Sequence, residues 1–325
     1  MITRRQIVLA LGAAATAPLT AFGQPKSGRI ARIGLLSYLG GSDIALTMLN
    51  RGLSELGYVE GKNYVIVTRY ANGDFTLMPK LLAELEAEKI DVLVTRGPSV
   101  NFAESVRARI PIVFAYSGDP IVAGFGDSLR KPGRNMTGIT FMAMELSATR
   151  IEVLKEMVPK ATRIALVSNP EHSGELKEYS VTEETARRLG ATITRYLVRK
   201  PEELAPAFSA IRTSAADAII VFPDALTLAR RKEIADLAAQ IRIPCIYGWS
   251  EFAEAGGLIS YGPSLVESFK TLAVYVNKIL AGTPAGNIPI EQTSAIRLTV
   301  NMGAVKALGI SVPQSILARA DKLIE

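Results

Sequence analysis

Short apolar runs alternate with amphipathic stretches along most of this chain. The runs are typical of strands buried on both faces of a parallel sheet, and in the first part of the chain they are residues 30–37, 64–70, 91–95 and 112–116. Between them, apolar residues recur at helical spacing, as in Ile44, Met48, Leu49, Leu53 and Leu56. Strands that alternate with helices of this length predict βαβ units and a parallel, right-handed wound sheet.

The same order of patterns occurs twice, about 130 residues apart. Arg32–Ser37 is echoed by Arg163–Ser168, and Arg109–Phe114 is echoed by Arg242–Tyr247. Solenoid repeats have periods of roughly 20–50 residues, so this repeat predicts two similar, doubly wound α/β lobes instead. Two such lobes facing each other form a cleft, and we expect the function there.

The order of the predicted elements assigns each segment to a lobe. We predict that residues 29–138 and 256–295 form lobe 1 and that residues 139–255 form lobe 2. Residues 296–325 should supply a final hinge strand and C-terminal helices, which we expect on lobe 2. Several strands would then cross between the lobes and form a hinge that permits opening and closing.

The N-terminus has the pattern of an export signal. Arg4 and Arg5 precede an apolar run from Ile7 to Ala17, and small residues follow around Ala21–Gly23, which predicts a signal peptide over residues 1–23. The paired arginines favour the twin-arginine route and leave the Sec route open. The cleavage region is followed by no cysteine, so we expect a periplasmic protein without a lipid anchor.

Composition describes a globular chain with a modest charge. Of 325 residues, 48% are hydrophobic and 21% are charged. The net charge of +6 falls to +4 without the signal, from 37 − 2 = 35 basic against 31 acidic residues. The basic residues are dispersed, so we expect no nucleic-acid partner. Cys245, the single cysteine, lies in an apolar strand and is expected in the core.

Ligands of parallel sheets bind at the carboxyl ends of the strands, beside helix N-termini. Here those ends are residues 37–42, 96–99, 116–120, 169–173, 222–225 and 247–250. Free N–H groups at helix starts suit a carboxylate, and Asp224 suits an ammonium group. Four aromatic residues could cover an apolar body: Tyr38, Tyr116, Phe222 and Trp249. This combination predicts a zwitterionic or aromatic small molecule.

Structural roles compete with ligand contact at several of these positions. Ser42 and Ser99 suit helix capping as well as they suit a ligand. Asp119 precedes Pro120, which favours a turn residue. Asp224 is the better ligand candidate, and the place of Trp249 at the end of a strand favours a role in the cleft.

The sequence contains no pattern that calls for catalysis. His172 and Cys245 are the only His and Cys, and there is no nucleophile elbow, phosphate-binding loop or metal-ligand spacing. We therefore expect no enzyme activity, no metal and no cofactor. An exported α/β enzyme stays a formal alternative without a residue constellation to support it.

The turn residues resemble one known family. The segments that carry the resemblance are Leu56–Asn63, Ile110–Phe114, Gly118–Pro120, Lys131–Gly138, Asn169–Ser173, Val300–Asn301 and Ala307–Gly309. From about Arg29 to Glu325 the chain is similar to the ABC transporter substrate-binding proteins that include tryptophan and tyrosine binders. The resemblance implies a periplasmic binding-protein type I-like fold and delivery of a captured solute to a permease in the inner membrane.

The resemblance also implies a set of pocket residues. By matching positions, the pocket would be lined by Ser37, Gly97, Ser99, Tyr116, Ser117, Asp119, Ser173 and Asp224. The residues themselves add Tyr38, Ser42 and Trp249. Two departures from the family pattern, Ala225 after Asp224 and the loop 38–42, lie where a ligand would bind, so the fold and the role carry over better than the substrate does.

Two functions of different kinds follow. The first is an extracytoplasmic, monomeric solute receptor of an ABC importer that closes its hinge on an aromatic or branched amino acid or on an aromatic carboxylate. The alternative is a periplasmic ligand sensor that serves a membrane signalling protein.

Overall fold

Two β-sheets organise the chain. The computed structural model describes residues 29–325 except positions 39, 41–43, 142 and 173, so the predicted signal peptide lies outside the described residues. The strands of the first sheet are β1 (Ala31–Ser37), β2 (Tyr64–Tyr70), β3 (Val92–Arg96), β4 (Ile112–Tyr116), β5 (Met136–Thr140) and β11 (Glu291–Gln292). Those of the second are β6 (Arg163–Ser168), β7 (Thr192–Leu197), β8 (Ala218–Val221), β9 (Cys245–Tyr247), β10 (Ile259–Pro263), β12 (Ile296–Asn301) and β13 (Lys322–Ile324).

The two sheets repeat one strand order. The first runs β11-β5-β4-β3-β1-β2, and the second runs β13-β12-β10-β9-β8-β6-β7. The shared part is the parallel series β5-β4-β3-β1-β2, which corresponds to β10-β9-β8-β6-β7. The two similar parallel-sheet lobes predicted from the sequence repeat are thereby confirmed. Lobe 2 departs from the pattern at one edge, where β12 pairs antiparallel with β10.

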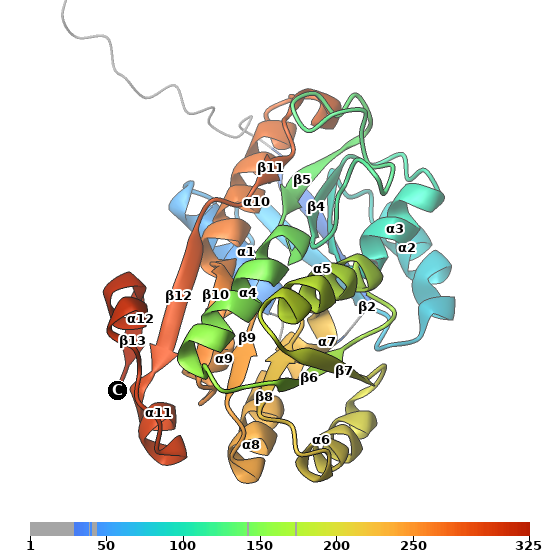
Figure 1. The fold of residues 1–325 in the computed structure, drawn as a ribbon. Helices are drawn as coiled ribbons and strands as arrows, with labels where there is room; N and C mark the ends of the chain where they lie inside the picture. The colour runs from blue at the N-terminus through green and yellow to red at the C-terminus, as the bar shows by residue number, and fades with distance from the viewer. Residues whose placement is uncertain (1–28, 39, 41–43, 142, 173) are drawn as a thin grey trace, which may run out of the picture.

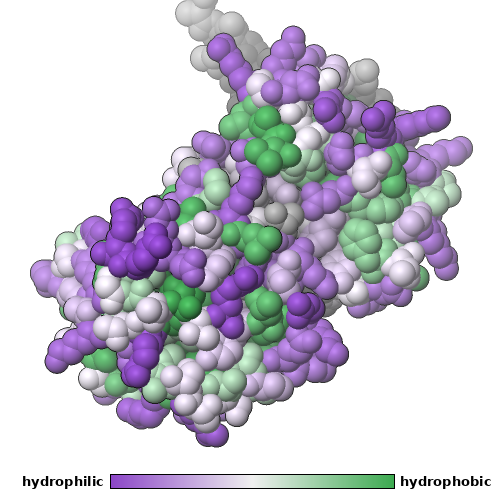
Figure 2. Space-filling model, turned by 45° about the vertical axis from the view of Figure 1, so that its right-hand side comes forward, coloured by the Kyte–Doolittle hydropathy of each residue, from purple (hydrophilic) through white to green (hydrophobic). Residues whose placement is uncertain are grey.

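Helices pack against each sheet and complete two lobes, which Figure 1 shows as an upper and a lower body. Lobe 1 carries α1 (Ile44–Glu55), η1 (Phe75–Leu77), α2 (Met78–Ala87), α3 (Pro98–Ser105), α10 (Leu265–Leu280) and η3 (Ala285–Asn287). Lobe 2 carries α4 (Ala143–Met157), α5 (Glu175–Arg188), η2 (Pro201–Glu203), α6 (Leu204–Thr213), α7 (Ala225–Ala229), α8 (Arg231–Ile241), α9 (Ser250–Glu254), α11 (Met302–Leu308) and α12 (Gln314–Arg319). In the space-filling view the lobes form two masses arranged diagonally (Figure 2).

The segment after residue 256 is divided between the lobes. The sequence places all of 256–295 in lobe 1, which is wrong for β10, because β10 pairs with β9 and β12 inside the second sheet. The chain returns to lobe 1 only at α10, which packs on α1 and on the first sheet. The helical pattern of residues 265–280 predicts an amphipathic helix, but it does not indicate which sheet contains the strand before it.

The chain crosses between the lobes three times: after β5, after β10 and after β11. One buried apolar cluster contains residues of both sheets, such as Val94 of lobe 1 and Val167 of lobe 2. The same cluster contains Phe141, which follows β5, and Trp249, and the centroids of their rings lie 6.1 Å apart. These rings therefore pack beside the first crossing. None of the described helices has the length and apolar character needed to span a membrane.

Candidate functional site

The strand order reverses at the same place in both sheets, between β1 and β3 and between β6 and β8. Loops that leave the carboxyl ends of such strands diverge and open a crevice for a ligand. In lobe 1 these loops contain Tyr38 and Gly97, and in lobe 2 they contain Asn169 and Asp224. The pKa of Tyr38 is raised by burial and then by the charges of Glu171, Asp74 and Asp224, of which Glu171 and Asp224 belong to the crevice loops of lobe 2.

A cavity of about 280 Å³ lies between the lobes. Its lining comes from lobe 1, from the start of α4 and from lobe 2, and consists of Asn101, Tyr116, Gly118, Asp119, Val122, Ala123, Met144, Gly174, Lys177 and Glu178. The lobes meet at its wall, because a Cβ atom added to Gly174 would lie 3.8 Å from the Cα of Gly118. Tyr116 and Asp119 of the predicted set line this cavity.

His172 lies in a buried polar network of lobe 2 and is 6% exposed. Its Nε2 is 2.9 Å from Oε1 of Glu178, and its Nδ1 is 4.0 Å from Oδ2 of Asp224. Burial alone would lower the pKa of His172, but the hydrogen bond and charge of Glu178, together with the charges of Asp224 and Glu175, raise it above the ordinary value. The imidazole thus lies between two buried carboxylates beside the inter-lobe cavity and is hydrogen-bonded to that of Glu178.

Asp224 is largely occupied within the protein. Its Oδ1 accepts hydrogen bonds from the backbone N–H of Leu226 at 2.8 Å and from Nδ2 of Asn169 at 3.2 Å. It also caps α7 in a capping box with Thr227, and it is only 4% exposed. Its position beside the crevice agrees with a ligand role, but its contacts are those of a residue that orders the two loops.

Two glutamates on the first turn of α5 differ in their contacts. Glu175 accepts a hydrogen bond from Ser168 Oγ at 2.7 Å, and both of its oxygens accept from Nη2 of Arg195, at 2.7 and 2.8 Å. Among the described residues, His172 contacts Oε1 of Glu178, and the buried Oε2 has no hydrogen-bond partner. The sequence analysis missed both residues, although acidic residues on the first turn after a polar loop were a visible signal.

Arg150 of α4 is fully buried behind this network. Its Nε donates to the carbonyl of Tyr261 at 2.9 Å and its Nη1 to the carbonyl of Ala143 at 3.4 Å, while Nη2 has no partner. Burial lowers its pKa to about 10, and the charge of Glu178 opposes that shift. The guanidinium therefore stays positive at neutral pH and links the segment after the first crossing to the strand before the second.

The predicted residues of lobe 1 are close together at the ends of β1, β3 and β4. Ser99 does not cap α3: it lies inside the first turn, is fully buried, and its Oγ has no hydrogen-bond partner among the residues that the structure describes. Gly97 precedes α3 with φ +57°, a conformation that favours glycine. Ser37 and Ser117 are buried at the ends of β1 and β4.

Asp119 has the turn role that the sequence favoured, and its ligand role stays a prediction. Its Oδ1 accepts from the backbone N–H groups of Ile121 and Val122 at 2.8 and 3.2 Å, which is the turn that the following proline suggested. The residue is exposed and lines the inter-lobe cavity. The turn therefore holds a carboxylate at the cavity wall.

The predicted aromatic residues occupy different environments. Tyr38 donates from its hydroxyl to the carbonyl of Gly73 at 2.8 Å, and its ring packs against Phe75. Trp249 is 3% exposed beside Phe141, and its Nε1 has no partner. Phe222 belongs to a core cluster within lobe 2, so the suggestion that it covers a ligand is wrong. The remaining candidates, Ser42 and Ser173, lie outside the described residues.

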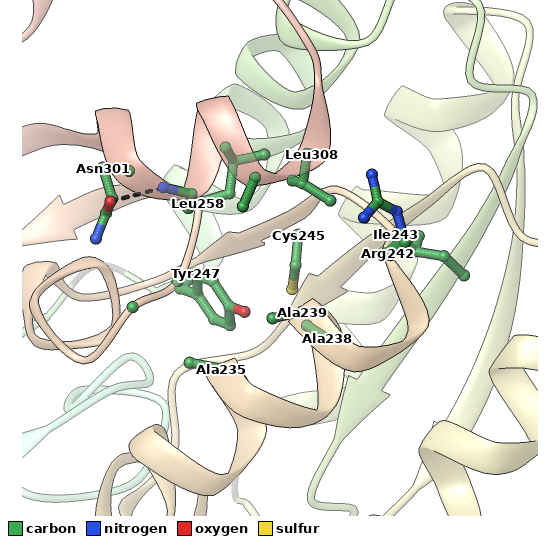
Figure 3. A pocket seen from close by; sticks show the side chains of 15 residues that line it. Ala235, Ala238, Ala239, Arg242, Ile243, Cys245, Tyr247, Leu258, Asn301 and Leu308 are labelled. Carbon is green, nitrogen blue, oxygen red and sulfur yellow. Dashed lines mark hydrogen bonds between the residues drawn. The ribbon is translucent and has the colours of Figure 1, made fainter.

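A second hollow of about 370 Å³ lies within lobe 2, between α8, α11, the strand β9 and residues 256–258 before β10 (Figure 3). Small side chains such as Ala238 and Ala304 line it together with Cys245 and Tyr247. Cys245 is 1% exposed, as predicted for a core residue, and burial raises the pKa of its thiol far above the ordinary value. This hollow belongs to one lobe, so closure between the lobes does not shape it.

Across the described part of the chain, no group of three or more His, Cys, Asp or Glu residues is placed to hold a metal ion. The polar groups at the inter-lobe cavity are instead arranged as single donors and acceptors on two facing walls. Such an arrangement can orient and enclose a small polar molecule.

Comparisons with known proteins agree with this geometry. A tyrosine-binding protein of Clostridioides difficile (strain R20291) is 23% identical over 259 residues, which are 79% of this chain and 74% of that protein. A structure from Streptococcus pneumonia in complex with L-Trp has a TM-score of 0.80 at 22% identity and covers 91% of this chain and 100% of its own. A ligand-free, open substrate-binding protein from Clostridium difficile has a TM-score of 0.62 at 22% identity and covers 91% and 99%.

The architecture of these structures is that of the type I periplasmic binding proteins, with two parallel-sheet α/β lobes, as the chain has here. The family described as ABC transporter substrate binding protein matches residues 41–324. This chain therefore belongs to the ABC transporter substrate-binding protein family.

Proposed function

We propose that the mature chain, from about residue 24, is an extracytoplasmic solute receptor that delivers a small molecule to an ABC permease in the inner membrane. The observation that carries this proposal is the cavity between the lobes, whose walls come from both lobes and from the start of α4. A solute held there contacts both lobes at once, so its binding free energy favours the shut arrangement. Export by a twin-arginine or Sec signal to the periplasm is part of the proposal.

The arrangement of the lobes supports closure around the solute. The Trp-bound structure and the open, ligand-free structure have the same 22% identity and cover the same 91% of this chain, yet their TM-scores are 0.80 and 0.62. The contact between Gly118 and Gly174 agrees with a shut arrangement as well. Because three segments cross between the lobes, we propose a hinge motion and a monomeric receptor.

The proposed solutes are aromatic or branched amino acids and aromatic carboxylates. Relatives support both classes, since one solved structure binds L-Trp and another solute-binding protein, from R. palustris, binds benzoate. The site residues we propose are those of the predicted set at the cavity and crevice, with Asp224 ordering the loops. We propose a binding role without catalysis, because the sequence contains no nucleophile elbow and no other catalytic motif.

A thermal-shift screen of residues 24–325 against amino acids and aromatic acids tests the receptor function. Binding at one site stabilises the folded state by about 2.7 kcal/mol when the ligand is at a hundredfold excess over Kd. A large shift from one chemical class supports the receptor, and no shift from any compound contradicts it. Uptake of the labelled solute into cells that lack the gene then separates import, which is lost, from a sensor role, which leaves uptake intact.

A further inference from the structure

The two lobes contribute different polar groups to the inter-lobe cavity. One of these groups, the carboxylate of Glu178, has an oxygen without a hydrogen-bond partner among the described residues. Glu178 lines the cavity from the first turn of α5, and its residue surface is only 1% exposed. His172 contacts Oε1, whereas no described residue lies within hydrogen-bond distance of Oε2. A buried carboxylate oxygen without a hydrogen-bond donor lowers the stability of the fold. In native proteins such atoms are therefore paired within the protein or with a ligand.

Neighbouring carboxylates in lobe 2 do not share this feature. Glu175, three residues earlier on α5, accepts from Ser168 and Arg195 through both oxygens. Asp224 accepts from Leu226 and Asn169, with His172 beside its other oxygen. Glu178 is thus the member of this set with an unpaired oxygen in a residue that lines the cavity.

The surroundings of Glu178 favour a donor from outside the chain. The charge of Glu178 raises the pKa of Arg150, but among the described residues Nη2 of Arg150 and Oε2 of Glu178 each have no hydrogen-bond partner. Lys177, the next residue on α5, lines the same cavity and is exposed. Asn101 and Tyr116 face Glu178 from lobe 1, so a molecule that pairs with Glu178 also contacts the opposite wall.

We propose that Glu178 accepts a hydrogen bond from a primary ammonium group of the solute, so that the receptor takes amino acids and related amines and rejects aromatic carboxylates that lack the amine. This inference rests on the proposed solute-binding function and names the substrate class of that site. It also transfers the ammonium contact from Asp224, where the sequence placed it, to a residue on α5.

Matched pairs of compounds test the inference on the native protein. Titration calorimetry would compare L-tryptophan, L-tyrosine and L-leucine with 3-indolepropanoate, 3-(4-hydroxyphenyl)propanoate and 4-methylpentanoate, each of which lacks only the amine. We expect at least one amino acid to bind and its partner acid to bind about 100-fold more weakly or less, because the unpaired carboxylate then stays buried. Equal affinity within a pair overturns the inference.

Glu178→Gln provides an independent test, with Glu184→Gln as the matched control on an exposed part of the same helix. We expect Glu178→Gln to lower the affinity for the amino acid by about tenfold or more. The difference in affinity between the amino acid and its matched acid should become smaller. Glu184→Gln should change neither. Unaltered affinity and selectivity in Glu178→Gln overturn the inference.

Native mass spectrometry of the purified protein separates failure of the inference from failure of the receptor function. A retained solute without nitrogen, or tight binding of an acid by a protein that binds no amino acid, overturns the inference and leaves the receptor standing. Binding of neither series, with no retained solute, contradicts both.

Discussion

The carboxyl edges of the two sheets have one strand order and different side chains. Lobe 1 presents hydroxyl and aromatic groups, among them Ser99, Tyr116 and Tyr38, and its rings pack on neighbouring phenylalanines. Lobe 2 presents a charged network around His172 and Glu178. We therefore propose a division of roles, in which lobe 1 covers the body of a solute and lobe 2 binds its polar head.

Different interactions fix the side chains at the carboxyl edge of each sheet. In lobe 2, hydrogen bonds between charged side chains fix the groups before a solute arrives, as in the contact of Arg195 with Glu175. In lobe 1, packing of Tyr116 on Phe125, with ring centroids 4.8 Å apart, holds the wall. Removing a charge from lobe 2 should consequently disturb more than trimming lobe 1.

The largest expected effect is on stability, at Asp224. Asp224→Ala removes the cap of α7 and leaves Asn169 and His172 with fewer partners, so the free energy of unfolding should fall by about 3 kcal/mol. Urea unfolding measures this. Asp236→Ala, which removes an exposed partner of Lys232, serves as the control and should cost less than about 0.5 kcal/mol.

The same variant also discriminates between two roles. If Asp224→Ala kept its stability but lost solute binding, Asp224 would be the ammonium ligand that the sequence suggested, and the division between Asp224 and Glu178 would be wrong.

The second effect concerns the contact between the lobes. A Cβ on Gly174 would lie 3.2 Å from Glu178 Oε1, 3.5 Å from His172 Nε2 and 3.8 Å from the Cα of Gly118, so the longer side chain of Gly174→Leu should crowd lobe 2 and hinder full closure of the lobes. Solute affinity should fall about tenfold or more, which is about 1.4 kcal/mol. Calorimetry gives the affinity, and small-angle scattering with solute gives the radius of gyration. Ala210→Leu on the exposed face of α6 is the control, and equal behaviour of the two variants would rule out the contact as part of closure.

The third effect is a pH dependence, which tests the charged network of lobe 2. The pKa of His172 is raised in the folded state, so its protonation stabilises the fold fully below pH 6.5 and this stabilisation is lost as pH rises through the folded pKa. His172 is the only histidine, so the window is specific to it. The native protein should exceed His172→Gln in unfolding free energy by more at pH 6 than at pH 8. A difference that does not change with pH would contradict the pairing with Glu178.

The smallest effect separates the two hollows. Ala304→Leu fills the hollow between α8 and α11, which belongs to lobe 2 alone. We expect solute affinity to change by less than about twofold, since no side chain there is shared with the inter-lobe cavity. A tenfold loss of solute affinity in calorimetry would indicate that the solute binds in the hollow of lobe 2 instead.

The sequence predicts the fold well because the repeat and the apolar periodicity are local signals. Arg32–Ser37 and Arg163–Ser168 become β1 and β6, the equivalent central strands of the two sheets. The placement of β10 was not predictable in the same way. Sheet membership depends on pairing with β12, which is far along the chain, and no local pattern records that partner.

The candidate site was predictable in position and less so in the roles of its residues. Strand ends are visible in the sequence, so the sequence places Tyr116 and Asp119, which line the cavity, and Asp224 at such ends. Whether an oxygen is already occupied depends on contacts between loops, such as that of Asn169 with Asp224. Glu178 was missed because it lies one helical turn beyond the loop, where a glutamate usually faces solvent.

A crystal structure of the mature protein with its tightest solute tests the central claim most directly. We expect electron density for the solute in the cavity between the lobes. Its ammonium nitrogen should lie within hydrogen-bond distance of Oε2 of Glu178, and its body should contact lobe 1. Density in the lobe 2 hollow near Ala304, or a solute that touches one lobe only, would contradict it.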